Sequence, residues 1–234
     1  IERLREKTSQ SIGNKRRPRP TDKIEFFKPI YDKPIVLKTN INETYAAAGI
    51  PKRYYDMSFD WLKENGTFQS ADKEAYAIVK DYRDNLAEYM NTGKGLILRG
   101  PAGTGKTSLA VCILKEVMKL NTGAMMISMP NLLDTMLTLS KGDRVAYLAY
   151  EQKLKHIPML LLDDFGAEYS KSDWVAAKVE SIIIERYNSM RPIILTTNYS
   201  DQWTKDNYSG RIYDRLRGEY KVAVFMGQSH RDKS

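Results

Sequence analysis

The chain has 234 residues, of which 42% are hydrophobic, and it carries a formal net charge of +8 at pH 7. This length and composition suit one α/β domain with a substantial core plus an extension. The single cysteine, Cys112, excludes an internal disulfide and a cysteine-based zinc site, and we expect it to be a small core residue. The sequence shows no signal-peptide pattern and no apolar run of about 18 residues, so we expect no membrane span and a cytoplasmic location.

The first 20 residues hold seven basic and two acidic side chains, which is most of the excess positive charge. Prolines lie among these basic residues, and no apolar periodicity precedes residue 40. We therefore predict that residues 1–40 are a basic, proline-containing, disordered linker or tail and that residues 41–234 form the folded domain. The tail either contacts nucleic acid phosphates or is a solvated linker, and the sequence favours neither.

An apolar and aromatic segment opens the folded part, where Tyr54, Phe59 and Trp61 precede the motif described next. Aromatic side chains at that place either lie against a bound base or pack on the core. We expect Trp61 to pack on the core and leave the other two open. Apolar residues then recur at three- and four-residue steps from Ala71 to Met90, which predicts one amphipathic helix ending at 91–93.

A phosphate-binding loop is predicted at residues 100–107, which read GPAGTGKT and fit G-x-x-x-x-G-K-[ST]. The glycines let backbone N–H groups point at anionic oxygens, Lys106 can reach the β- and γ-phosphates, and Thr107 offers a hydroxyl to Mg²⁺. An apolar strand at 95–99 precedes the loop and an amphipathic helix follows it, as the motif requires. The predicted nucleotide-binding residues are Gly100, Pro101, Ala102, Gly103, Thr104, Gly105, Lys106, Thr107 and Ser108.

The chain continues with a second predicted strand at 124–129 and two helical pieces at 131–139 and 144–155. The second helical piece carries Tyr147, Tyr150, Lys153 and Lys155. It either faces a ligand threaded past the domain or is an amphipathic helix with a solvated face.

A pair of acidic residues follows the third predicted strand. Four apolar residues at 159–162 run into Asp163 and Asp164, which is the Walker B pattern. A parallel strand buried on both faces explains the apolar run, and ligands of such sheets bind beyond the carboxyl ends of the strands. We predict that Asp163 holds Mg²⁺ through water, together with Thr107, and that Asp164 orients or activates the attacking water.

A helix from Asp173 to Asn188 leads to a fourth predicted strand at 192–198 that ends in polar residues. Asn198 could hydrogen-bond the γ-phosphate or the attacking water there, although an isolated Asn at a strand end is more often a turn former. A short basic helix at 210–217 and a last strand at 221–225 follow.

Together these segments resemble the DnaC/IstB-like group of AAA+ ATPases, which includes replicative helicase loaders and transposition helper ATPases. The resemblance is carried by GIPKRY at 49–54, the loop at 100–107, LLDDFG at 161–166, LTTN at 195–198, RIYDRL at 211–216 and SHR at 229–231. It implies an α/β P-loop NTPase (AAA+) three-layer sandwich with a central five-stranded parallel sheet. It also implies ATP hydrolysis with ATP and Mg²⁺ bound, and a hexameric replicative helicase and single-stranded DNA as partners.

The resemblance further implies roles for single residues. Asn198 matches the sensor I residue, Arg231 matches sensor II, and Arg215 matches the arginine finger that reaches a neighbouring subunit's ATP, with Arg211 as the second candidate. The segment 131–156 matches the insert that contacts single-stranded DNA. The chain departs from the group in reading Ser-His-Arg where many relatives have Ser-Tyr-Arg, and we expect a full C-terminal lid domain and a complete helicase-binding N-terminal domain to be absent.

These inferences favour an ATPase that acts in DNA replication as a helicase loader, binds single-stranded DNA with ATP and self-associates through the finger. A transposition helper ATPase is the nearest alternative, since it shares almost every motif. A small-molecule kinase fits poorly with Asn198 and the separated C-terminal arginines. A non-hydrolysing, nucleotide-gated interaction module is disfavoured because Lys106, Thr107, Asp163 and Asp164 are all present.

Overall fold

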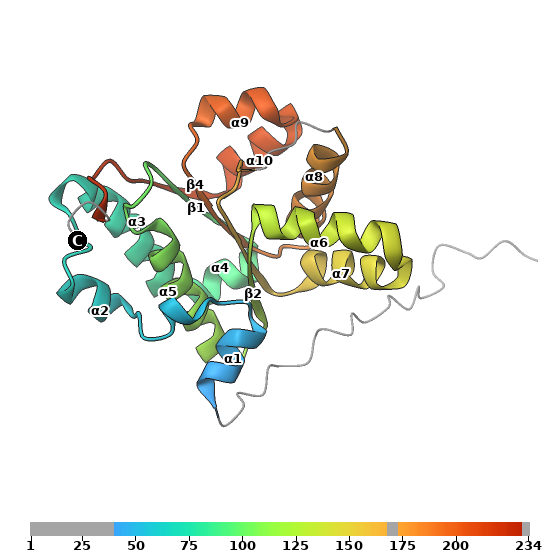
Figure 1. Cartoon of the computed structure of the whole chain (residues 1–234). Helices are drawn as coiled ribbons and strands as arrows, with labels where there is room; N and C mark the ends of the chain where they lie inside the picture. The colour runs from blue at the N-terminus through green and yellow to red at the C-terminus, as the bar shows by residue number, and fades with distance from the viewer. Residues whose placement is uncertain (1–39, 168–172, 231–234) are drawn as a thin grey trace, which may run out of the picture.

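The computed structural model describes residues 40–167 and 173–230, whose arrangement is shown in Figure 1. Within these residues five parallel strands form one sheet in the order β2-β3-β4-β1-β5. The strands are β1 (Leu96–Arg99), β2 (Ala124–Ser128), β3 (Met159–Asp163), β4 (Ile193–Thr197) and β5 (Lys221–Val224). Parallel neighbours need long crossover connections, and helices supply them here. The predicted five-stranded parallel α/β sheet is therefore confirmed.

The sheet separates two hydrophobic cores, because successive side chains of a strand point to opposite faces. Leu96 and Leu98 of β1 face one core, whereas Ile97 between them faces the other. The first core is covered by α1 (Ile41–Ala47), η1 (Lys52–Tyr54), α2 (Phe59–Glu64), α3 (Lys73–Asp84), α4 (Leu86–Thr92) and α5 (Lys106–Lys119), and the short η2 (Ser70–Asp72) directly precedes α3. The second is covered by α6 (Met129–Gly142), α7 (Arg144–His156), α8 (Asp173–Asn188), α9 (Asp201–Asn207) and α10 (Gly210–Glu219). Figure 1 shows these two helical layers on either side of the sheet.

The carboxyl ends of the central strands meet at one edge of the sheet. Arg99 at the end of β1 is in register with Thr197 of β4 and with Val224 of β5. On the other side of β4, Leu162 of β3 aligns with Leu195, so the chain leaves β3 at Asp163 close to the same edge. The segments that follow β1, β3 and β4 therefore converge, as the sequence predicted for the loop, the acid pair and the polar strand end.

The prediction of a single helix over 71–90 is wrong. The chain forms two helices there, α3 and α4, with a break at Asn85. The Asn85 side-chain Nδ2 donates to the backbone oxygen and to Oδ1 of Asp81, both at 3.0 Å. The Asn85 backbone N–H still donates to the Asp81 carbonyl oxygen at 3.0 Å, so the break is a local change in the backbone angles of Asn85, whose φ is −108° and ψ 23°.

The segment before the sheet is anchored on β2. The Met126 N–H donates to the Ala48 carbonyl oxygen at 2.7 Å. Gly49 follows with a φ of +77°, and a Cβ there would lie 2.4 Å from the Met126 carbonyl oxygen, so only glycine fits. This contact fixes where the following η1 segment lies. Of the predicted tail, only Asn40 belongs to the described residues, as the N-cap of α1.

No helix within residues 40–167 and 173–230 combines the length and the apolar character that crossing a membrane requires.

Candidate nucleotide site

The loop between β1 and α5 has a backbone that its glycines make possible. Gly103 and Gly105 have φ values of +80° and +85°, in the left-handed region that favours glycine. A Cβ on Gly103 would lie 2.2 Å from Oγ of Ser229, and one on Gly105 would lie 2.8 Å from Cγ2 of Thr67. The loop therefore curves tightly into the N-terminus of the 14-residue helix α5, whose first N–H groups can face an anion.

The predicted phosphate-binding cation, Lys106, lies inside the curve of this loop. Its Nζ donates to the carbonyl oxygens of Gly100 at 2.8 Å and Pro101 at 2.6 Å, and the side chain is buried. Gly100 and Pro101 thus hold the lysine through their backbone. The Thr104 hydroxyl donates to the Pro101 carbonyl oxygen at 3.0 Å and closes the turn.

Thr107 and Asp163, the two predicted Mg²⁺ ligands, are in direct contact. The Thr107 hydroxyl donates to Oδ1 of Asp163 at 2.8 Å, and the Thr196 hydroxyl donates to the same oxygen at 2.6 Å. Burial raises the pKa of the Asp163 carboxyl, while the hydrogen bonds from Thr196 and Thr107 oppose that rise. A hydroxyl and a carboxylate oxygen at this spacing are hard oxygen donors, so these two residues fit a Mg²⁺ site.

Asp164 and Asn198 lie at the same edge as the loop. Asp164 has a φ of +55° and is exposed, unlike the buried Asp163 next to it. Its backbone N–H donates to the Thr196 hydroxyl at 3.0 Å, and the Thr197 hydroxyl donates to the Phe165 carbonyl oxygen at 2.6 Å. These bonds join the ends of β3 and β4, so Asp164 and Asn198 both project into the space above the loop.

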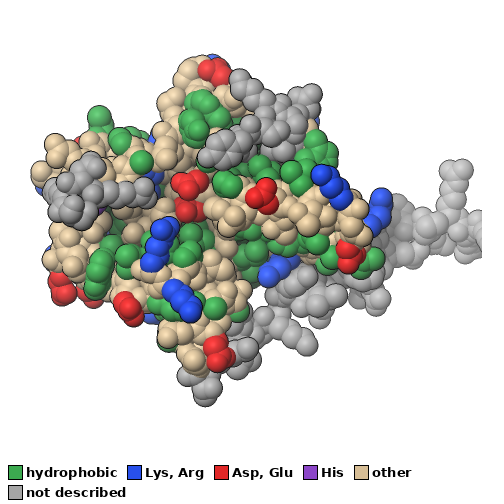
Figure 2. Space-filling view, viewed as in Figure 1, with side chains coloured by type: hydrophobic (Ala, Val, Ile, Leu, Met, Phe, Trp, Pro, Cys, Tyr) green, Lys and Arg blue, Asp and Glu red, His purple; other side chains and the backbone are tan. Residues whose placement is uncertain are grey.

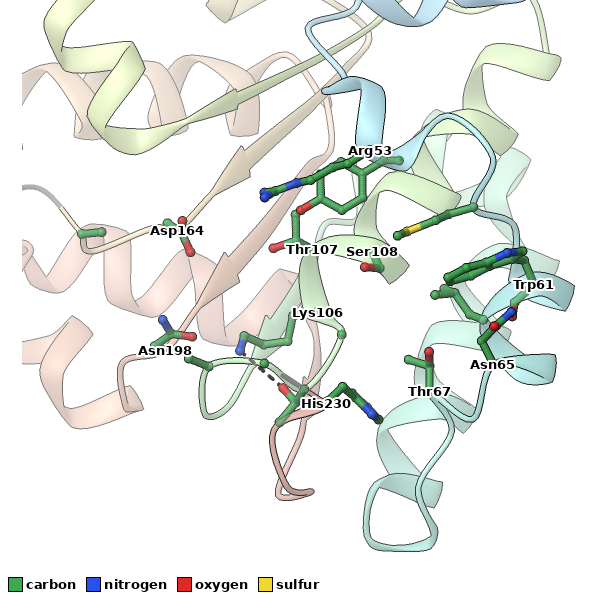
Figure 3. Close-up of a pocket in the computed structure, with 18 of the residues that line it drawn as sticks. Arg53, Trp61, Asn65, Thr67, Lys106, Thr107, Ser108, Asp164, Asn198 and His230 are labelled. Carbon is green, nitrogen blue, oxygen red and sulfur yellow. Dashed lines mark hydrogen bonds between the residues drawn. The ribbon is translucent and has the colours of Figure 1, made fainter. Parts of the chain in front are cut away.

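The loop residues 102–108, Asp164 and Asn198 line one cavity of about 750 Å³, drawn in Figure 3. This volume is in the range of sites that hold a small organic ligand. The wall opposite the loop comes from the segment around η1 and α2. Its lining residues are Arg53, Tyr54, Met57, Trp61, Leu62 and Asn65. Apolar and aromatic side chains of this wall suit a base, and the loop opposite suits phosphates.

Two residues of this wall differ from the prediction. Trp61 does not pack on the core: its residue surface is 39% exposed and it lines the cavity, because the short helix α2 turns Leu62 inward instead. Phe59 of the same helix packs partly against the core. Arg53 was not predicted as a site residue, although its place directly before Tyr54 in the GIPKRY stretch was a usable signal.

Of the three predicted arginines, Arg211 and Arg215 lie apart from this cavity. The Arg215 guanidinium carbon is 4.8 Å from the ring centre of Tyr187 on α8, and Arg211 is exposed on the same helix α10. Arg231 lies outside the described residues. The preceding residue, His230, lines the cavity and donates its backbone N–H to the Gly103 carbonyl oxygen at 2.9 Å.

The helical piece at 144–155, for which the sequence left open a threaded ligand or a solvated face, turns several of its marked side chains inward. Tyr147 and Tyr150 of α7 pack partly against the second core. Lys155 pairs with Glu151 at 2.6 Å. The exposed basic residues of the α6–α7 pair are instead Lys141 and Arg144, on either side of the turn between the helices.

Residues 62–234 match the model of a family described as IstB-like ATP binding protein. The chain belongs to this family. This IstB-like chain is 22% identical to the Escherichia coli K12 replicative helicase loader DnaC over 195 residues, which is 82% of the chain and 76% of DnaC. It is 31% identical to the Bacillus subtilis replicative helicase loader DnaI over 152 residues, which is 61% of the chain but only 47% of DnaI.

A third relative belongs to a mobile element. The ATP-binding protein of insertion sequence IS232 from Bacillus thuringiensis is 28% identical over 153 residues, 62% of this IstB-like chain and 58% of that protein. Among solved structures, the DnaC helicase loader gives a TM-score of 0.63 at 25% identity, covering 75% of this chain and all of that one. The DnaI structure gives 0.62 at 26% identity, covering 76% and 95%. The expected resemblance and the AAA+ fold are thus confirmed.

Proposed function

We propose that this IstB-like protein binds and hydrolyses ATP with Mg²⁺ and acts in DNA replication as a helicase loader. One observation carries the enzymatic part of the proposal: Lys106, Thr107, Asp164 and Asn198 line one cavity at one edge of the sheet, and Thr107 contacts Asp163 directly behind it. In this proposal residues 41–234 are the ATPase domain and residues 1–40 are a basic tail.

Each of these residues has a distinct chemical task in hydrolysis. Lys106 would exchange the loop carbonyls for phosphate oxygens and so neutralise charge in the transition state. Asp164 is exposed to the cavity and would orient the attacking water and accept its proton, with Asn198 holding the other side of that water. Thr107 and Asp163 would hold Mg²⁺, which when bound supplies Lewis-acid stabilisation of the phosphates. Arg231 would face the nucleotide from the C-terminal segment.

The loader assignment is supported by the two relatives named replicative helicase loaders, DnaC and DnaI. A hexameric replicative helicase is then the protein partner and single-stranded DNA the nucleic acid. Figure 2 shows basic side chains over the region of the α6–α7 pair, where Lys141 and Arg144 are exposed. Cations at that place suit a phosphate backbone. Subunits would assemble through Arg215, which does not line its own cavity.

A transposition helper ATPase remains the second candidate, because the family description and the IS232 relative favour it. The two functions differ in the protein they engage. The Asp164→Ala variant is used because it should bind ATP and hydrolyse it slowly. It is loaded with ATP and mixed with the replicative helicase and, separately, with a transposase from the same genome. Complexes are then measured by size-exclusion chromatography and native mass spectrometry.

A loader forms an ATP-dependent complex with the helicase and promotes helicase activity on circular single-stranded DNA. A helper forms the complex with the transposase. The Lys106→Ala variant controls for nucleotide dependence in both arms. A helicase that neither binds nor gains activity on circular single-stranded DNA would contradict the loader assignment.

A further inference from the structure

Arg53 is a cationic side chain of the cavity that the proposed hydrolysis has not used. It comes from η1, before the first strand, and reaches the cavity from the wall opposite the phosphate-binding loop. In Figure 3 its guanidinium extends over Thr107 toward the side from which Asp164 projects, while Lys106 lies on the other side of Thr107. An anion seated on the loop would therefore have cations on two sides.

The backbone that carries Arg53 is fixed to the same helix that carries the loop lysine. Lys115 of α5 is buried, and its Nζ donates to the carbonyl oxygens of Tyr54, Tyr55 (2.8 Å) and Met57 (2.7 Å). These three carbonyls belong to the turn that follows Arg53. One helix thus sets both Lys106 at its start and Arg53 beside it, which is the rigid support a binding site needs.

The guanidinium itself is oriented but not neutralised. Its carbon lies 4.8 Å from the ring centre of Tyr54, a distance at which a cation and a ring attract. Within the part of the chain that the structure describes, Arg53 makes no ion pair and no hydrogen bond. Asp164 lines the same cavity as Arg53.

We propose that Arg53 binds the terminal phosphate of the ATP held by its own subunit. This deepens the proposed ATPase function and depends on it. A planar guanidinium offers paired donors that match two phosphate oxygens, which a single ammonium does not. Such a contact acts within one chain and is separate from the finger proposed for Arg215. It gives the cavity a preference for a triphosphate over a diphosphate.

The adjacent residue provides a matched control. Lys52 is also basic, also exposed and on the same turn, but it does not line the cavity. Binding of the non-hydrolysable triphosphate AMPPCP and of ADP is measured by calorimetry with Mg²⁺ for Arg53→Ala, Arg53→Lys and Lys52→Ala. Thermal unfolding of each variant checks that the fold is kept.

Arg53→Ala should weaken AMPPCP binding about 10–100-fold, the usual value of a hydrogen-bonded charge contact, and leave ADP binding near wild type. Arg53→Lys should recover part of the AMPPCP affinity, and Lys52→Ala should bind both nucleotides normally. Equal affinity of Arg53→Ala and Lys52→Ala for AMPPCP would overturn the proposal, as would an equal loss for ADP and AMPPCP. Lys106→Ala distinguishes failure of the Arg53 proposal from failure of the proposed ATPase function. If Lys106→Ala still binds AMPPCP normally, the proposed ATPase function itself is wrong.

Discussion

The Arg99 guanidinium donates a hydrogen bond to the Asp201 carboxylate, with 3.0 Å between Nη2 and Oδ1. Arg99 is the last residue of β1 before the phosphate-binding loop, and Asp201 opens α9 just after Asn198. The other Asp201 oxygen accepts a hydrogen bond from the Tyr213 hydroxyl at 2.7 Å. Tyr213 lies on α10, so one carboxylate joins the loop strand, the polar end of β4 and the helix that carries Arg215.

Asp201→Ala should therefore separate nucleotide binding from turnover. Neither Arg99 nor Asp201 lines the nucleotide cavity, so AMPPCP affinity should stay within about twofold of wild type. Turnover in the assembled state should fall several-fold, because α10 loses its tie to the loop. The side chain is half exposed, so we expect the free energy of unfolding to fall by only about 1 kcal/mol.

Steady-state ATPase rates against protein concentration and AMPPCP calorimetry measure the two effects of Asp201→Ala. Asp206→Ala is the matched control, since Asp206 is an exposed acid of the same helix that bonds only Gln202 among the described residues. A loss of affinity as large as the loss of turnover would show that Asp201 supports the binding site itself.

Lys106→Ala and Asp164→Ala should affect different steps. Lys106 holds the inside of the loop, so its loss removes the cation that faces the phosphates and should abolish ATP binding. Asp164→Ala should leave binding largely intact and slow hydrolysis, because it removes only the group proposed to orient water. Calorimetry and single-turnover hydrolysis report the two steps. Equal loss of binding in both variants would mean that the roles of Asp163 and Asp164 are wrongly assigned.

Replacing Arg186 should strongly lower the stability of the fold. It is fully buried on α8, and its guanidinium donates to the carbonyl oxygens of Leu154, Ile157, Pro158 and Pro192 at 2.7–3.1 Å. Burial lowers its pKa to about 9, so it stays charged at pH 7. Arg186→Met leaves these buried carbonyls without their donor and should lower the free energy of unfolding by about 3–5 kcal/mol.

Chemical denaturation with urea measures this loss of stability. Arg144→Met is the control, because Arg144 is exposed on the neighbouring helix α7 and should change stability by less than about 0.5 kcal/mol. Equal midpoints for the two variants would show that water or neighbouring groups satisfy the carbonyls around Arg186.

The parts of the fold that could be predicted from sequence are those with a local signature. The strands were visible because a parallel strand buried on both faces is a continuous apolar run, as at 159–162. The loop at 100–107 and the acid pair were visible because their chemistry restricts residue type at each position. The break at Asn85 is not predicted because it consists of one residue with non-helical backbone angles, and the apolar periodicity continues on both sides of it.

The cavity wall was harder to predict because distant contacts build it. Trp61 and Arg53 line the nucleotide cavity because Met126 holds the chain before Arg53 against β2 and Lys115 holds the turn after it against α5. Nothing near Arg53 in the chain shows that its turn will be fixed by a lysine of a later helix. The tie between Arg99 and Asp201 likewise joins segments that no local pattern relates.

Single-stranded DNA should bind better than duplex DNA, and better with ATP than without. Binding should weaken steeply with salt, because neutralised phosphates release counterions. The slope of log K against log salt is negative. Replacing the exposed Lys141 and Arg144 with alanine should make it less steep by roughly 0.7 for each phosphate that is no longer neutralised. Fluorescence anisotropy at several salt concentrations measures this slope, with Lys205→Ala on α9 as the control.

Deleting residues 1–20 should weaken DNA affinity, because it removes five net positive charges, and should keep the effect of ATP, which is proposed to arise at the nucleotide cavity. Equal affinity for single-stranded and duplex DNA at every salt concentration would contradict a single-stranded DNA site. Binding would then be explained by the charge of the basic tail alone.

The last prediction concerns Arg215, whose position suits a neighbour's nucleotide better than its own. Its guanidinium lies against the Tyr187 ring, outside the cavity, and Nη1 is buried with no hydrogen-bond partner among the described residues. A planar fork of donors suits a γ-phosphate offered across an interface, and a finger acting in trans accelerates hydrolysis by about 10³–10⁵-fold where it operates. Arg215→Ala should therefore bind ATP almost normally as a monomer and hydrolyse it poorly.

Mixing Arg215→Ala with Asp164→Ala should restore part of the activity. At some mixed interfaces the intact Arg215 of one chain meets the intact Asp164 of the other, so one complete site forms from two inactive proteins. Arg211→Ala, on the same helix and exposed, is tested in the same mixing assay to decide between the two candidate fingers. ATPase activity per subunit should also rise with protein concentration in the wild type. If it does not, and mixing restores nothing for either arginine, the finger acts within its own chain or only in folding, and assembly through this helix is wrong.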